Sequence, residues 1–421
     1  MPLYYLYFQE QNLKESLLIV LKYAKNHYQY LLQHDSEGKG IGLSYFKERG
    51  YNLNTIEKFE LGYSKKDWNN FEDAALKQGY KAEFLDKAGL VIQKENRRYD
   101  RFRGRVMFPV HDLSGRVVAF GARTLKKDDK PKYLNSPETE VYHKSRVLYG
   151  IYQAKQHIRK QDECLLVEGY TDVISMHQAG VENVVSSSGT SLTESQIKLI
   201  KRFTDNITVL YDGDTAGIKA SLRGIDLILE QGMNVKAVNL PEGEDPDSFV
   251  KKKGSEKFEE YLKKNSKDFI TFRTELFLED IQNDPIQKAK LIREIAQTIA
   301  KVPDVFKRTL FNKKCSELLG IDEQILVSEV NKTLIQNRQK DKQNPKQKTD
   351  ETPLPITVSK EVQKEIQTAG STFEQALMLQ EQEVIRLLVK HGHKFLNEEQ
   401  RVYQYFLDQI EKHNNGQSLP K

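Results

Sequence analysis

The sequence contains very little cysteine. Its 421 residues include only Cys164 and Cys315, which form no CxxC pair and belong to no cluster of cysteines and histidines. A disulfide framework or a zinc ribbon needs several such residues at close spacing. We therefore expect no zinc in this chain, and the scarcity of cysteine fits a reducing, cytoplasmic location.

Long apolar runs and a strong charge of one sign are also missing. The longest apolar run near the amino terminus, Leu17 to Leu21, is too short for a signal peptide or a membrane span. We predict no targeting segment and no contact with a membrane. The 65 basic and 60 acidic residues leave a formal net charge of +5, so the total charge is only a weak indication of polyanion binding.

A chain of this length can hold two or three domains. Helical spacing of apolar residues predicts a helix from Leu13 to Leu32, and the glycine-rich stretch Ser36 to Gly42 predicts a break after it. Between Ser44 and Gly150, short helical pieces alternate with the strand-like "RFRGRVMFPV" and "GRVVAFGAR", separated by the turn-forming "HDLSG". This pattern is typical of an α+β region.

From Glu163 onward, short apolar strands alternate with amphipathic helices. That alternation predicts a doubly wound, mainly parallel sheet with helices on both faces. Beyond Gly254 the pattern is helical to about Val330, which indicates a small helical bundle. Residues 336–355 are rich in lysine, glutamine and proline and predict a flexible linker, after which a last helical piece begins near Thr372.

Acidic side chains follow three strands of the predicted sheet. Asp212 and Asp214 come after "NITVLY", Glu168 comes after "CLLV", and Asp245 and Asp247 follow "NVKAVNL". Loops at the carboxyl ends of parallel strands meet at one edge, where ligands bind. Two carboxylates ~4 Å apart repel by roughly 4 kcal/mol at an effective dielectric near 20, and a bound cation reverses that effect. Without histidine or cysteine among them, the acids favour Mg²⁺ or Mn²⁺.

The alternative for any single acid is a solvated loop residue or a helix cap, and for Asp172 in "EGYTD" this alternative is as good as a functional role. A basic strand is predicted nearby. Alternation in "RFRGRVMFPV" puts Arg101, Arg103 and Arg105 on one face, at about 7 Å spacing. Such a face would match the phosphates of single-stranded DNA or of its hybrid with RNA.

Three motifs resemble the Toprim domain shared by bacterial primases, type IA and II topoisomerases and certain nucleases. They are "EGYTDVI", "LYDGDTAG" and "EDPDSF", in that order. The preceding "YDRFRGRVMFPVHDLSGRVVAFGAR" and "KPKYLNSPETEVYHKSRVLYG" resemble the basic subdomain of bacterial DnaG-type primases. The resemblance extends from about Tyr28 to Val330. It implies a mixed α/β and α+β fold and a DNA-dependent RNA polymerase that makes short RNA primers from NTPs on single-stranded DNA.

The resemblance implies roles for the acids. Asp212 and Asp214 would hold Mg²⁺, and Glu168 would complete that site or accept the proton of the attacking hydroxyl. A second ion would bind Asp245 and Asp247. The three residues expected to be catalytic are Glu168, Asp212 and Asp214.

Further basic and polar residues in the primase-like motifs would line the cleft that faces the metals, where triphosphates and template phosphates lie. These are Lys132, Asn135, Lys144 and Arg146. The segment "SYFKERG" resembles the start of the primase core, and there we predict a structural helix end, with Glu48 and Arg49 solvated.

The resemblance also implies a division of the chain into six segments. They are an N-terminal helical segment (1–43), a basic subdomain (44–160), the Toprim domain (161–254), a helical subdomain (255–330), a flexible linker (331–371) and partial helicase-binding helices (372–421). The chain departs from the family pattern in two ways: no Cys/His set precedes the core, and the tail resembles only the beginning of the helicase-docking domain. We therefore expect weak initiation by this chain alone, doubtful docking to the replicative helicase, and a monomer.

Other functions are compatible with parts of the pattern. A Toprim nuclease would use the same acids, and a non-catalytic scaffold would bind single strands or tether a helicase. "LYDGDTAG" also resembles the DxDx[T/V] signature of haloacid-dehalogenase-type phosphatases, but Ala216 occupies its fifth position and "EGYTD" would stay unexplained. Nucleotide incorporation, DNA loss or binding alone would separate these hypotheses.

Overall fold

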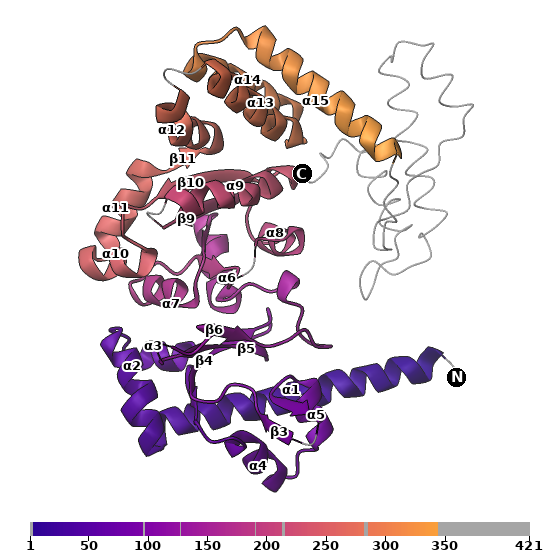
Figure 1. The fold of residues 1–421 in the computed structure, drawn as a ribbon, viewed down its shortest axis with the longest axis vertical. Helices are drawn as coiled ribbons and strands as arrows, with labels where there is room; N and C mark the ends of the chain where they lie inside the picture. The colour runs from indigo at the N-terminus through magenta and orange to yellow at the C-terminus, as the bar shows by residue number, and fades with distance from the viewer. Residues whose placement is uncertain are drawn as a thin grey trace, which may run out of the picture. The chain divides into compact units, whose positions relative to one another are not determined.

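A computed structural model describes residues 3–95, 97–126, 128–189, 191–212, 215–281 and 285–343 (Figure 1). The chain divides into two compact units, Met1–Asn344 and Pro345–Lys421, and the described residues belong to the first. The predicted helices of residues 372–421 lie outside the described residues. No helix in the described ranges combines the length and the apolar character that crossing a bilayer requires.

The N-terminal subdomain contains a four-stranded antiparallel sheet in the order β1-β4-β5-β6. Its strands are β1 (Gly62–Ser64), β4 (Arg105–His111), β5 (Val117–Thr124) and β6 (Tyr133–Asn135). The predicted turn between β4 and β5 is present, because the Asp112 carboxylate accepts hydrogen bonds from the backbone N–H groups of Ser114 and Arg116. A separate hairpin joins β2 (Val91–Lys94) to β3 (Arg97–Asp100).

Helix α1 (Leu3–His34) packs on this sheet and is longer than predicted. Its apolar side chains Leu17, Leu21 and Tyr28 are buried in one cluster with Met107 of β4 and Phe120 of β5. The predicted N-terminal segment (1–43) and basic subdomain (44–160) therefore share one hydrophobic core. Short helices complete this subdomain: α2 (Ser44–Glu48), α3 (Leu53–Lys58), α4 (Asn70–Lys77) and α5 (Ala82–Lys87).

The predicted glycine-rich break is a wide helical turn, the π-helix η1 (Gly38–Leu43), rather than a loop. Gly38 permits it, because a Cβ atom there would lie 1.9 Å from the carbonyl oxygen of Leu31. The glycines in this stretch therefore allow close backbone packing while the chain stays helical.

The second sheet has the predicted doubly wound character. Its order is β11-β10-β9-β7-β8, and all pairs are parallel except β10 with the edge strand β11. The strands are β7 (Cys164–Val167), β8 (Val184–Ser186), β9 (Asn206–Tyr211), β10 (Asn234–Asn239) and β11 (Lys267–Asp268). The helices around it are α6 (Ile151–Gln161), α7 (Tyr170–Gln178), α8 (Glu194–Lys201), α9 (Thr215–Glu230), α10 (Pro246–Lys253) and α11 (Ser255–Asn265).

Both faces of this sheet are buried, which explains the continuous apolar runs of its strands. Leu166 and Val209 belong to one hydrophobic cluster, whereas their chain neighbours Leu165 and Leu210 belong to another. Alternate residues of each strand therefore face different layers of helices. The predicted capping box of α8 is present, since Thr193 accepts a hydrogen bond from the backbone N–H of Gln196.

A helical bundle follows, as predicted. It consists of α12 (Phe269–Ile281), α13 (Pro285–Lys301), α14 (Val305–Leu319) and α15 (Glu323–Gln343). The apolar face of α13, including Leu291, Ile295 and Ile299, is buried. The predicted start of the linker is wrong, because α15 continues helical through residues 331–343. Lysine, glutamine and arginine are good helix formers, so a polar composition there does not end the helix.

Candidate functional site

The carboxyl ends of β7, β9 and β10 lie at one edge of the parallel sheet, and an acidic residue follows each of them. Glu168 is exposed after β7, Asp212 is half-buried after β9, and Asp245 opens α10 after β10. The fourth predicted acid of this edge, Asp214, lies outside the described residues.

Asp172 in the first turn of α7 belongs to the same group of acids. Its side chain is buried, and one carboxylate oxygen accepts a hydrogen bond of 2.9 Å from the backbone N–H of Gly169. Burial raises the pKa of Asp172 to about 7, and the charges of Asp245 and Asp212 add to the effect. Sequence analysis left this residue open, although its place in "EGYTD" puts it one helical turn from Glu168.

These acids fit a hard divalent cation. In the described part of the chain, no three acidic, cysteine or histidine side chains are arranged as a complete metal site. The acids nevertheless follow the carboxyl ends of neighbouring parallel strands, so they lie along one edge of the sheet. All of the donors are carboxylate oxygens, which is the chemistry that Mg²⁺ and Mn²⁺ prefer.

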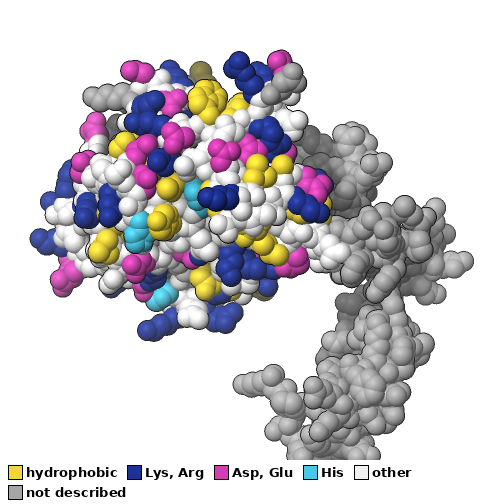
Figure 2. All heavy atoms as spheres, turned by 90° about the horizontal axis from the view of Figure 1, so that it is seen from below, with side chains coloured by type: hydrophobic (Ala, Val, Ile, Leu, Met, Phe, Trp, Pro, Cys, Tyr) yellow, Lys and Arg dark blue, Asp and Glu magenta, His cyan; other side chains and the backbone are white. Residues whose placement is uncertain are grey.

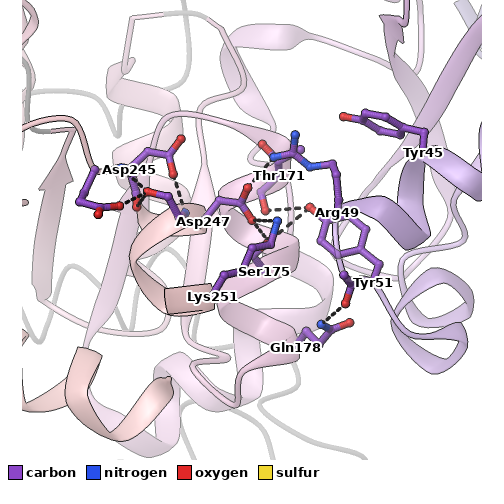
Figure 3. A network of polar contacts seen from close by, with 12 residues as sticks. Tyr45, Arg49, Tyr51, Thr171, Ser175, Gln178, Asp245, Asp247 and Lys251 are labelled. Carbon is purple, nitrogen blue, oxygen red and sulfur yellow. Dashed lines mark hydrogen bonds and ion pairs between the residues drawn. The ribbon is translucent and has the colours of Figure 1, made fainter. Parts of the chain in front are cut away.

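Asp247 lies deeper than its neighbour Asp245 and is already paired. Figure 3 shows it between α7 and the N-terminal subdomain, where one carboxylate oxygen is 2.5 Å from the Arg49 guanidinium. The other oxygen is 2.6 Å from the Lys251 ammonium and accepts a hydrogen bond from the Ser175 hydroxyl. A second ion at Asp247 would have to replace these cations. Asp245 instead caps α10 by accepting a hydrogen bond of 2.6 Å from the backbone N–H of Ser248.

The prediction that Arg49 is solvated is wrong. Its guanidinium lies 5.7 Å from the centre of the Tyr45 ring, and its Nε is buried without a hydrogen-bond partner among the residues that the structure describes. Two further contacts join the same region to α7: the Tyr51 hydroxyl donates to the carbonyl of Thr171 (3.1 Å), and the Gln178 amide donates to the carbonyl of Gly50 (2.9 Å). The sequence carried no signal for these pairings between distant segments.

The prediction of one arginine-bearing strand face is also wrong. Residues 101–104 form a turn, Gly104 has a φ of +65°, and β4 begins only at Arg105. The Arg101 Nε donates to the carbonyl of Gly89 (2.7 Å), and the buried Arg105 guanidinium donates to the carbonyl of Pro131 (3.0 Å). These two arginines satisfy backbone carbonyls instead of forming a common surface. Contact of the three arginines with nucleic acid stays a prediction.

Arg103 differs from the other two arginines. Its guanidinium lies 4.1 Å from the ring centre of Trp68 and 4.6 Å from that of Tyr99. Trp68 is the single tryptophan of the chain and is 62% exposed. A cation stacked on exposed aromatic rings is a surface on which nucleic-acid bases can also stack. Sequence analysis missed Trp68, although the single tryptophan of the chain, placed in the polar stretch "KKDWNN", was a usable signal.

Most of the remaining predicted residues lie where the two subdomains meet, whereas the contacts of Lys132 are within the N-terminal subdomain. Lys132 is exposed just before β6, and Lys144 and Arg146 lie in the short 3₁₀ helix η2 (Lys144–Arg146). The backbone carbonyl of Lys144 accepts a hydrogen bond of 3.2 Å from the Gln196 side chain of α8. Asn135 ends β6 and contacts the start of α7.

Arg123 of β5 is a further cation at this junction that sequence analysis missed. Its guanidinium lies 5.2 Å from the Tyr45 ring centre and 5.5 Å from that of Tyr133, and its Nε is buried without a partner in the described ranges. Away from the junction the charges are mixed: Figure 2 shows basic and acidic side chains interspersed over the face seen from below. Arg49 and Arg123, whose other guanidinium nitrogens bond to Asp247 and to the Tyr45 hydroxyl, each keep a buried Nε without a partner in the described ranges, and this distinguishes the junction from ordinary surface.

Three segments of the chain match known protein families. Residues 27–155 match the family described as the DNA primase catalytic core, N-terminal domain, and residues 165–250 match the Toprim-like family. Residues 279–324 match the DnaB-helicase binding domain of primase.

Individual proteins that are similar to this chain are DNA primases. The DNA primase of Clostridium acetobutylicum is 43% identical over 284 residues, which cover 67% of this chain and 47% of that protein. The DNA primase of Halalkalibacterium halodurans is 37% identical over 325 residues, which cover 76% of this chain and 54% of that protein. This chain thus spans about half the length of these relatives.

Solved structures show the same relationship. A DNA primase domain from Pseudomonas aeruginosa has a TM-score of 0.68 and 36% identity, covering 75% of this chain and 99% of that one. A DnaG primase catalytic domain bound to ssDNA has a TM-score of 0.66 and 34% identity, with coverage of 75% and 99%. The fold and the acidic edge thus define a Toprim-containing catalytic core. The chain belongs to the bacterial DnaG-type DNA primase family.

The comparison identifies a helicase-related segment that we did not predict. Residues 279–324, which include α13 and α14 of the helical bundle, match the helicase-binding family. The predicted helicase-binding helices in residues 372–421 lie outside the described residues and stay a prediction. Amphipathic helices look alike in sequence whether they close a core or dock on a partner. Helical periodicity alone therefore could not assign the bundle to this family.

Proposed function

We propose that this chain is the RNA-polymerising core of a primase, which joins NTPs into short RNA primers on a single-stranded DNA template. The observation that carries the proposal is that Glu168, Asp212 and Asp245 follow the carboxyl ends of three neighbouring parallel strands, β7, β9 and β10. The adjoining subdomain belongs to the primase catalytic core family. A Toprim nuclease or a scaffold would not require that subdomain.

The residues at this edge would divide the chemistry between them. Mg²⁺ would be held by Asp212 and Asp214, with Glu168 beside them, and when bound it would neutralise charge on the reacting phosphate and orient it. Glu168 is exposed and not engaged in an ion pair within the described residues, so it is available to accept the proton of the attacking 3′-hydroxyl.

Basic residues from the other subdomain would bind the anionic substrates. Lys132, exposed just before β6, and Lys144 and Arg146 of η2 would contact the phosphates of the NTPs and the template. Arg103, stacked on the exposed ring of Trp68, would hold the single strand through its phosphates while a base stacks on the indole. A structural relative, a DnaG primase catalytic domain, is bound to ssDNA, which supports the binding of a single strand by this chain.

A primer-synthesis assay with labelled NTPs, single-stranded DNA and Mg²⁺ tests the proposal. We expect short RNA from the wild type and a loss of at least about 100-fold in Asp212→Ala, because the substitution removes charge stabilisation of the transition state. Asp205→Ala is the matched control, since Asp205 is an exposed aspartate at the opposite end of β9. Quenching of Trp68 fluorescence by DNA should persist in both variants, because binding and chemistry use different residues.

Each other outcome contradicts the proposal in its own way. Loss of DNA in the presence of Mg²⁺ would identify a nuclease, and fluorescence quenching without RNA synthesis by the wild type would identify a scaffold. Full synthesis by Asp212→Ala would remove the proposed role of that carboxylate.

We further propose that the helical bundle docks on the replicative helicase through α14. Phe306 is 84% exposed, and Leu310 and Val305 are 67% and 62% exposed. Phe306 and Leu310 are four residues apart and therefore share a face of the helix. Exposed large apolar side chains on one helix face are typical of a docking surface, and they lie inside the segment that matches the helicase-binding family.

A further inference from the structure

Tyr170, the first residue of α7, is held by side chains of the other subdomain. Its buried ring stacks on Phe108 of β4, with 5.2 Å between the ring centres, and meets the edge of the Tyr149 ring at 4.7 Å. The Tyr170 hydroxyl donates a hydrogen bond of 2.7 Å to the amide oxygen of Asn135, at the end of β6. Tyr170 comes two residues after Glu168, so its position fixes the turn that presents that carboxylate.

Gly121 of β5 makes this contact possible. A Cβ atom at Gly121 would lie 2.4 Å from the Cζ atom of Tyr170 and 2.5 Å from its hydroxyl oxygen. The absence of a side chain on β5 therefore lets the tyrosine ring lie directly on the N-terminal sheet. A larger residue at Gly121 would push the start of α7 away from it.

Asn135 reaches a second loop at the same edge of the parallel sheet. Its amide nitrogen donates a hydrogen bond of 3.3 Å to the carbonyl of Ser188, which follows β8. Ser188 has a φ of +56°, a conformation that non-glycine residues adopt only when their surroundings hold them in it. The Asn135 contact is part of what holds this loop.

Ser186 connects the turn after β7 with the loop after β8. The Ser186 hydroxyl donates to the carbonyl of Glu168 (2.6 Å) and accepts a hydrogen bond from the backbone N–H of Ser188 (2.9 Å). The bonds thus run from Tyr170 through Asn135, Ser188 and Ser186 to the backbone of Glu168. Buried polar networks in which each member is satisfied fix one arrangement of the groups that they join.

We propose that Asn135 and Tyr170 form a clamp between the subdomains that positions Glu168 and the loop after β8 for catalysis. This role rests on the proposed polymerase function. It makes Asn135 a positioning residue rather than a nucleotide contact, because both ends of its amide are already bonded to protein. The orientation of the amide is fixed as well, with its oxygen toward the tyrosine and its nitrogen toward the Ser188 carbonyl.

Tyr170→Phe tests the clamp by removing one hydroxyl. Tyr149→Phe is the matched control, because Tyr149 is buried in the same aromatic cluster but its hydroxyl has no hydrogen-bond partner among the described residues. We expect kcat for primer synthesis to fall roughly 10-fold in Tyr170→Phe, with an unchanged KM for NTPs and unchanged DNA binding, since misplacing a reacting group slows chemistry without loosening substrate. Tyr149→Phe should retain the wild-type kcat.

The double variant separates the clamp from direct nucleotide contact. If the two side chains act as one unit, Tyr170→Phe combined with Asn135→Ala is no slower than Asn135→Ala alone. If Asn135 instead contacts the nucleotide independently of Tyr170, Asn135→Ala raises the KM for NTPs, Tyr170→Phe causes a separate loss of its own, and the two losses multiply in the double variant. That second result overturns the proposal.

Amide hydrogen exchange provides a readout that does not need activity. We expect exchange at residues 186–189 to become at least about fivefold faster in Tyr170→Phe and to stay unchanged in Tyr149→Phe, because the clamp holds that loop. Faster exchange in a chain that makes no primers would refute the polymerase function but keep the clamp. Unchanged exchange in Tyr170→Phe would refute the clamp whatever the activity.

Discussion

At the scale of single residues, burial determines whether the His177 side chain is charged. This side chain on α7 is 1% exposed, and its Nδ1 lies 3.2 Å from a carboxylate oxygen of Glu182. That distance suggests an ion pair, but burial lowers the pKa of His177 to about 4. The nearby Lys58 ammonium lowers this pKa further, and the two effects together outweigh the Glu182 carboxylate, which raises it. The imidazole is therefore neutral at pH 7.

The neutral histidine predicts a dependence of stability on pH. Because the pKa of His177 is about 4 in the folded chain and 6.5 in the unfolded chain, the unfolded state binds more protons between those values. Its contribution to stability is complete above pH 6.5 and is lost as pH falls toward 4. Between pH 7 and pH 5 the loss is roughly 2 kcal/mol.

Urea unfolding of the wild type and of His177→Gln at both pH values measures this loss. The difference between the two proteins isolates His177, because Asp100 and Asp172, whose raised pKa values act in the opposite direction, are present in both. We expect the variant to lose roughly 2 kcal/mol less than the wild type on acidification. Equal losses would show that folding does not lower the pKa of His177.

At the scale of elements, α14 predicts an effect on partner binding without an effect on folding. Phe306→Asp places a charge on the exposed face of the helix, so affinity for a DnaB-type helicase should fall at least about 10-fold, as expected for a buried aromatic anchor of an interface. Asn331→Asp adds the same charge at an exposed position of α15 and is the control. Calorimetric titration with the helicase measures both.

The Phe306→Asp substitution should also leave the stability of the chain almost unchanged. Since Phe306 is 84% exposed in the chain alone, its substitution should change the free energy of unfolding by less than about 0.5 kcal/mol. Unchanged helicase affinity in Phe306→Asp would place the docking surface elsewhere.

The sequence predicted elements well where one periodicity dominated. The buried strands β7, β9 and β10 were predicted because short apolar runs alternate with amphipathic helices in this part of the sequence. The predictions failed where a local backbone feature competed with the pattern: Gly104 with its positive φ starts β4 later than the alternation suggested, and close packing at Gly38 keeps a glycine-rich stretch helical. Neither feature changes the hydrophobic pattern, so neither is visible in it.

At the scale of the whole molecule, the subdomains are joined by the ion pair between Arg49 and Asp247, residues that lie 198 positions apart in the chain. Lys58 and Glu182 form a second pair across the same junction at 2.7 Å. The acids of the site could be predicted because each follows its own strand. Their protein partners could not, because a single sequence does not show which distant segments meet.

The Arg49 pair predicts a large effect of removing one partner. Arg49→Ala leaves the carboxylate of Asp247 buried with only Lys251 as a counter-ion, which should lower the free energy of unfolding by about 2 to 3 kcal/mol. Adding Asp247→Asn to that variant should recover part of the loss, because the unpaired charge is then gone. Denaturant unfolding of the four proteins of this double-mutant cycle measures the coupling. Additive losses would mean that the pair contributes nothing.

The central sheet should make distant parts of the chain unfold together. Val209 and Leu210 are neighbours on β9, yet Val209 packs in the cluster that includes Cys315 of the helical bundle, and Leu210 packs in the cluster that includes Phe46 of the N-terminal subdomain. Strand β9 therefore contributes to both hydrophobic clusters. Because neither cluster can unfold while β9 keeps its place, heating should produce a single calorimetric peak for the described part of the chain. A destabilising substitution in β9 should loosen both the helical bundle and the N-terminal subdomain.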